Sequence, residues 1–227
     1  YPLLDYRERE TMDPFGSYTT FRRYGRDYYN HISDHFYNGF SYNLNPHTGT
    51  YSLRVDNTAQ RFYIMDVSRL VNGRNYTLSF WLRNNDGSRP ALGQVIIRCY
   101  NPVTQQMVNS PHSVLSIVAG PIDGWYKVEA RLSSPLPNIP AGLEQRSIEL
   151  SFANANQLVD DIRLVPADAA CVAYVYHPKT LRLMAQLDNN NYATFYEYDA
   201  EGNMVRTKKE TDRGILTINE NRKSFTK

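Results

Sequence analysis

The sequence predicts an all-β protein in which two packed antiparallel sheets are followed by a short extension of β-hairpins. Several short segments alternate between apolar and polar residues and are separated by turn signals. The chain is rich in rings, with 18 Tyr, 9 Phe and 2 Trp, which favour strands. Its 227 residues leave room for one sandwich and a small appendage.

The clearest strands are predicted between residues 47 and 166. A turn at His47 to Thr50 precedes an alternating strand at 51–55, and the Asn72-Gly73 turn precedes another at 76–83. Further alternating segments are 95–100, 125–132, 147–152 and 161–165. Pro166 cannot donate to a strand ladder, so we expect the last strand to end there.

Strand alternation separates a core face from an outward face. In the strand at 76–83, the residues Tyr76, Leu78, Phe80 and Leu82 share one face, which leaves Trp81 and Arg83 on the other. In the strand at 95–100, Val95, Ile97 and Cys99 face one way, and Arg98 and Tyr100 face the other. The predicted outward face therefore carries the following side chains: Trp81, Arg83, Arg98 and Tyr100.

Three regions are predicted along the chain. Residues 1–46 form an N-terminal segment that we expect to contribute strands, residues 47–166 form the sandwich, and residues 167–227 form hairpins. In this tail, Tyr174-Val175-Tyr176 recurs as Tyr196-Glu197-Tyr198, and each copy runs into a turn.

Composition argues against two classes of partner. A formal charge of +2 gives no field for nucleic acid, and no run of about 18 apolar residues is present to insert into a membrane. Because the chain opens at Tyr1 rather than at Met, we expect it to be a piece of a larger parent polypeptide.

Four segments between residues 47 and 166 resemble the galactose-binding-like jelly rolls, which include many carbohydrate-binding modules. They are Gly49 to Leu53, Tyr76 to Arg83, Gly124-Trp125 and Val159 to Leu164. The resemblance implies a jelly-roll sandwich with a structural calcium ion, held by Asp160 and by backbone oxygens near Thr48. Calcium needs six or more oxygen ligands, so the alternative is a strand-end aspartate satisfied by backbone amides.

The tail resembles the Tyr-Asp repeats of rearrangement-hotspot proteins, which are large bacterial surface or secreted polypeptides. Tyr196 to Arg206 carries the pattern, and the first copy departs from it at His177. The resemblance implies an extracellular or cell-surface location.

These features predict a non-catalytic accessory module that binds a glycan. Sugars are recognised by flat rings and a few polar groups, which Trp81, Arg83, Arg98 and Tyr100 supply. The alternative is a structural or protein-interaction module with no sugar ligand, in which Trp81 is buried under another segment.

An enzyme is not expected. Asp160 and Asp161 are neighbours in a strand and should point to opposite faces, so they cannot flank one bond. His31 and His35 have helical zinc-site spacing but lack the glutamate of a metalloprotease.

Overall fold

The computed structural model describes residues 40–43, 45–136 and 140–221, which form two sandwich sheets and a tail sheet. Most of the predicted N-terminal segment lies outside the described residues, including the pair His31 and His35 and the short strands expected at 18–21 and, apart from Phe40, at 36–40. Nothing helical in the described part of the chain has the length and hydropathy of a membrane span.

The sandwich sheets are antiparallel throughout. Sheet A has six strands in the order β1 (Phe40–Asn43), β2 (Ser52–Val55), β10 (Gln157–Pro166), β4 (Asn75–Asn84), β8 (Trp125–Ser133) and β7 (Ser116–Ile122). Sheet B has four, in the order β3 (Arg61–Asp66), β9 (Glu144–Ser151), β5 (Gln94–Asn101) and β6 (Gln106–Val114). A short 3₁₀ helix, η2 (Val67–Arg69), follows β3.

The chain crosses repeatedly between the sheets, from β2 to β3, from β4 to β5 and from β8 through β9 to β10. This alternation is the connectivity of a jelly roll, in which neighbours along the chain pair with strands that are distant in sequence. The predicted fold class, an all-β sandwich with a hairpin extension, is confirmed.

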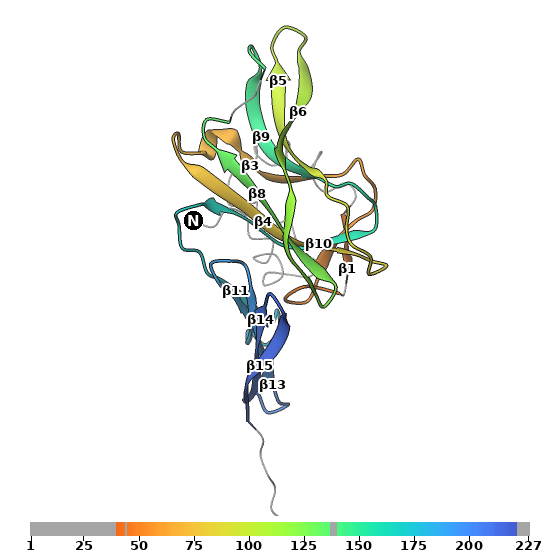
Figure 1. Ribbon diagram of the computed structural model, residues 1–227, viewed down its shortest axis with the longest axis vertical. Coiled ribbons are helices and arrows are strands. Elements are labelled where there is room, and N and C mark those ends of the chain that lie inside the picture. The colour runs from red at the N-terminus through yellow and green to blue at the C-terminus, as the bar shows by residue number, and fades with distance from the viewer. Residues whose placement is uncertain (1–39, 44, 137–139, 222–227) are drawn as a thin grey trace, which may run out of the picture.

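The tail sheet is a meander of five antiparallel strands in chain order. Its strands are β11 (Ala173–Tyr176), β12 (Leu183–Leu187), β13 (Ala193–Tyr198), β14 (Met204–Thr211) and β15 (Gly214–Glu220). The sheet lies at one end of the sandwich, and the β5–β6 hairpin lies at the other (Figure 1). At the β13–β14 turn, the Asp199 carboxylate accepts the backbone N–H of Asn203 at 2.7 Å, so this aspartate satisfies a backbone amide of the loop.

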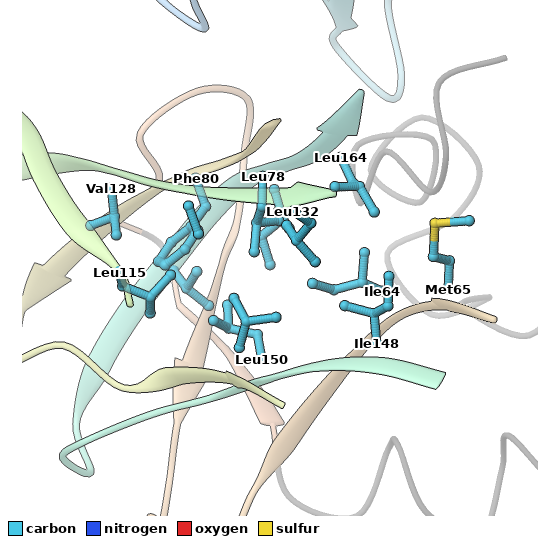
Figure 2. Packing of buried hydrophobic residues seen from close by; sticks show 14 of the residues in the cluster. Ile64, Met65, Leu78, Phe80, Leu115, Val128, Leu132, Ile148, Leu150 and Leu164 are labelled. Carbon is cyan, nitrogen blue, oxygen red and sulfur yellow. The ribbon is translucent and has the colours of Figure 1, made fainter. Parts of the chain in front are cut away.

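The core lies between sheets A and B (Figure 2). The alternation predicted for β4 and β5 is confirmed, because their predicted inward side chains are all buried there: Tyr76, Leu78, Phe80, Leu82, Val95, Ile97 and Cys99. Trp81 belongs to a second, smaller cluster with Ile122, Trp125 and Leu158. That cluster lies on the outer face of sheet A and positions the site described below.

Within sheet B, the backbone at the end of β9 approaches closely to Gly93, the residue before β5. A Cβ at this position would lie 1.9 Å from the carbonyl oxygen of Ser151, in the last residue of β9. We expect Gly93→Ala to lower the free energy of unfolding by about 3 kcal/mol, since backbone rather than a flexible side chain must move. Urea denaturation measures the loss.

Gly87→Ala is the matched control. Its Cβ would have open space, and only its positive φ of 77° opposes the change, at a cost of about 1 kcal/mol. Equal losses for the two variants would contradict the close approach at Gly93.

Candidate functional site at the junction of sandwich and tail

The contact between the sandwich and the tail is centred on His47, a buried residue in the connection between β1 and β2. Its ring stacks on Trp81 of β4, with the ring centroids 4.1 Å apart and an interplanar angle of 16°. Trp125 of β8 meets it edge-on at 5.7 Å, and Phe195 of the tail strand β13 at 6.4 Å. Residues from all three strands therefore enclose one imidazole.

Both imidazole nitrogens of His47 lie against carboxylates. Nδ1 is 2.6 Å from Oδ2 of Asp161 on β10, and Nε2 is 2.8 Å from Oε1 of Glu210 on the tail strand β14. Because an ionised carboxylate only accepts hydrogen bonds, the arrangement is fully satisfied when both nitrogens carry a proton. We call this Asp161–His47–Glu210 arrangement the His47 clasp.

The pKa of His47 is raised above its ordinary value of 6.5. Burial is the largest single influence and lowers the pKa, but the hydrogen bonds and charges of Asp161 and Glu210 together outweigh it. The imidazolium form of His47 is thus more stable in this arrangement than it is for an ordinary histidine.

A bulge in β10 brings both adjacent aspartates to the same side. The register of β10 against β4 shifts after Asp160, and Asp161 has a left-handed φ of 55°. Asp160 Oδ2 accepts the His47 N–H at 2.9 Å, while Asp161 accepts the Thr48 hydroxyl at 2.9 Å. The prediction that the two carboxylates point to opposite faces is wrong, because regular alternation does not pass through a bulge.

Trp81 is fully buried under the tail. Its Nε1 donates to the backbone oxygen of Asn191 at 2.8 Å. The side-chain amide of Asn191 in turn donates to the backbone oxygen of Asp161 at 3.0 Å. Tyr192 meets the Trp81 ring edge-on at 5.9 Å and lies 4.8 Å from Nζ of Lys127. The loop between β12 and β13 therefore occupies the outer surface of sheet A at Trp81.

The four predicted glycan-binding residues do not share one face. Trp81 and Arg83 lie on β4 of sheet A, whereas Arg98 and Tyr100 lie on β5 of sheet B. The outer faces of two sheets packed on one core point in opposite directions, so that part of the prediction is wrong. Arg83 donates to the Asp123 backbone oxygen at 3.4 Å.

On sheet B, the guanidinium of Arg98 approaches the Glu149 carboxylate at 4.0 Å. The Tyr100 ring lies 5.4 Å from the guanidinium of Arg146. Arg98 and Tyr100 of β5 thus each contact a residue of β9, but the structure does not bring them together with Trp81.

A cavity of about 310 Å³ opens beside the His47 clasp, and we call it the junction cleft. The sandwich lines it with residues 46–49 and with the β7–β8 turn, including Asp123 and Trp125. The tail lines it from β12, β13, β14 and β15, including Phe195, Glu197 and Lys208. Its walls therefore combine rings with hydrogen-bonding side chains and come from both parts of the chain.

The oxygens of Asp160 are directed at N–H groups. Oδ2 accepts from His47 N and, at 3.3 Å, from Thr48 N, and Oδ1 accepts from Asp161 N at 2.8 Å. Within the described ranges, no group of three His, Cys, Asp or Glu side chains is placed to hold a metal ion. Backbone N–H donors around Asp160 fit an aspartate that is satisfied by amides better than they fit a calcium ligand. Calcium binding stays a prediction.

The tail residues of the site were not anticipated from the sequence. Glu210 lies 163 residues beyond His47 in the sequence, and Phe195, Glu197 and Lys208 belong to the same distant segment. The one local signal was the turn at His47, which places an imidazole directly before a strand.

No protein-family model and no curated protein matches the chain. Among solved structures, it is similar to the CBM22-1–GH10 modules of Clostridium thermocellum endo-1,4-β-D-xylanase 10B complexed with xylohexaose, at 15% identity and a TM-score of 0.38, covering 58% of this chain and 25% of that one.

Two further similar structures come from Paenibacillus barcinonensis. One is a CBM22-1 xylan-binding domain, at 16% identity and a TM-score of 0.36, covering 60% of this chain and 90% of that one. The other is a CBM22-1–CBM22-2 tandem domain, at 14% identity and a TM-score of 0.36, covering 79% of this chain and 58% of that one. These TM-scores are too low to transfer a ligand or a site, so function has to be inferred from this chain's own residues.

The His47 clasp predicts a pH-dependent stability. A folded pKa above 6.5 means that the stabilisation is complete below that pH and is lost as the pH rises through the folded pKa. We expect Glu210→Gln to cost about 1 to 3 kcal/mol of unfolding free energy at mildly acidic pH and to flatten this dependence. Urea denaturation across the pH range measures both effects.

Glu201→Gln removes the same charge from an exposed turn of the tail and serves as the control. If the wild-type protein and Glu210→Gln gave parallel pH profiles, protonation of His47 would not be what stabilises the junction.

Asp160→Asn tests the role of that carboxylate. The amide would present N–H groups to backbone N–H donors, and we expect a loss of about 2 kcal/mol of unfolding free energy, equal with and without calcium. Thermal melts with added calcium and with a chelator measure this. A wild-type melting temperature that falls on chelation, with no response in Asp160→Asn, would instead support a calcium ion.

Proposed function

We propose that this chain is a non-catalytic module that binds a carbohydrate segment in the junction cleft. The observation that carries the proposal is the cleft itself, a cavity of about 310 Å³ with rings and polar side chains on facing walls. Pockets for small ligands start at roughly this size and combine apolar walls with a few placed polar groups.

The chemistry of the lining suits sugars. Phe195 offers a ring to the C–H face of a pyranose, and Asp123 and Glu197 offer carboxylate oxygens to hydroxyl donors. The cleft thus replaces the originally predicted face around Trp81, which is buried.

The His47 clasp argues for binding rather than hydrolysis. In a nucleophilic triad, one imidazole nitrogen is held by a carboxylate and the other takes a proton from a hydroxyl or thiol. Here the second nitrogen faces the Glu210 carboxylate, so it is not placed to take a proton from a nucleophile. Asp161 and Glu210 are themselves buried and bound to the imidazole, which removes them as an acid/base pair.

Phe195→Ala tests the site. We expect it to weaken glycan binding about tenfold, because a stacked ring contributes roughly 0.5 to 1.5 kcal/mol or more when desolvated. A glycan array identifies the ligand, and calorimetric titration of the full chain measures the affinity.

Tyr176→Ala is the control, since it removes an exposed ring from β11 of the same sheet, outside the cleft lining. Circular dichroism checks that both variants fold. Unchanged affinity in Phe195→Ala, or equal loss in both variants, would place the ligand elsewhere.

A second candidate is a structural module with no sugar ligand, and the burial of Trp81 under the tail favours it. In that case the junction is a rigid joint between the sandwich and the tail. A glycan array without binders, from a protein whose tail remains docked, would favour this candidate. A bacterial cell-surface or extracellular location, Tyr-Asp repeats in the tail and a larger parent polypeptide remain predictions.

A further inference from the structure

The cations that line the junction cleft, within the described residues, are already engaged by carboxylates. Lys208 forms an ion pair with Oε1 of Glu197, and both nitrogens of His47 are held in the clasp. A ligand that enters the cleft therefore meets these positive charges in neutralised form.

Among the described residues that line the cleft, carboxylates outnumber cations. Asp123, Glu197 and Glu210 line it, against Lys208 and His47. Glu197 also accepts a hydrogen bond from Arg206 at 2.9 Å, which in turn bonds Glu220. The hydrogen bond from Lys208 lowers the pKa of Glu197, with further help from Arg206, so Glu197 stays ionised at neutral pH.

We propose, on the basis of the function proposed above, that Glu197 determines the charge specificity of the cleft. By neutralising Lys208, it restricts the cleft to glycans that carry no carboxylate or sulfate groups. An acidic sugar would lose its hydration, face three carboxylates and find no cation able to pair with it without first breaking the Lys208–Glu197 contact.

This role differs from a simple contact with sugar hydroxyls. A residue that only accepts hydrogen bonds from a ligand would lower all affinities when it is replaced. A residue that neutralises a lysine would, when replaced by its amide, release that lysine and increase the affinity for acidic ligands in particular.

The test uses Glu197→Gln, which keeps the shape of the side chain and frees Lys208. The matched control is Glu144→Gln, which releases Arg146 from an equivalent ion pair on β9. Both variants change the net charge by the same amount, but residue 144 does not line the cleft.

The probes are an uncharged galactan and polygalacturonate, titrated against the full chain at low and moderate salt. For the wild type we expect polygalacturonate to bind at least about tenfold more weakly than galactan. For Glu197→Gln we expect that ratio to shrink by roughly fivefold, as one released charge pair allows, and the gain to be lost at higher salt. Glu144→Gln should behave as the wild type does.

Other outcomes separate the two proposals. Wild-type protein that binds polygalacturonate as well as galactan overturns the charge specificity, as does a Glu197→Gln variant that gains no more than Glu144→Gln. If the wild type binds neither these probes nor any glycan on an array, the proposed function fails. A selective gain in Glu197→Gln would still support the role of Glu197 in that case.

Discussion

The junction depends on one buried imidazole held between carboxylates of two different sheets. Asp161 belongs to the sandwich and Glu210 to the tail, so the His47 clasp is a direct electrostatic link between them. Burying two carboxylates is costly unless each is paired, and removing the cation would leave both uncompensated. The stacking on Trp81 adds an apolar surface that fixes the plane of the ring. The charge on His47 therefore contributes directly to holding the tail against the sandwich.

The bulge in β10 makes this link possible. Had β10 continued in regular alternation, Asp161 would point away from Asp160 and into the core side of sheet A. The left-handed backbone at Asp161 instead directs both carboxylates toward residues 47 and 48. An aspartate tolerates that conformation better than a bulky residue does. The departure from strand geometry thus lies where the polar contacts are concentrated.

Strand alternation predicted the inner strands of the sandwich and missed others. It identified β4 and β5 because, within the predicted segments, one side of each is apolar throughout and the other side includes polar residues. β6 and β7 are edge strands with mostly exposed side chains and internal prolines, so they show no apolar period. The tail side of the site was out of reach for a different reason. A contact between residues 47 and 210 leaves no local pattern in either segment, and the bulge that aims Asp161 is a tertiary feature.

Docking of the tail removes one candidate surface and creates another. The loop that carries Asn191 and Tyr192 covers Trp81, while β13 and β14 complete a cavity that the sandwich alone would leave open on one side. The tail supplies Phe195, whose ring is the proposed sugar contact, and the ion pair of Glu197 with Lys208. Under the function proposed above, substitutions in the hairpins alone would change ligand specificity, with the sandwich core and the His47 clasp unchanged. Such a division would separate stability from recognition, because the buried polar contacts fix the geometry of the junction and the more exposed tail side chains set the chemistry of the cleft.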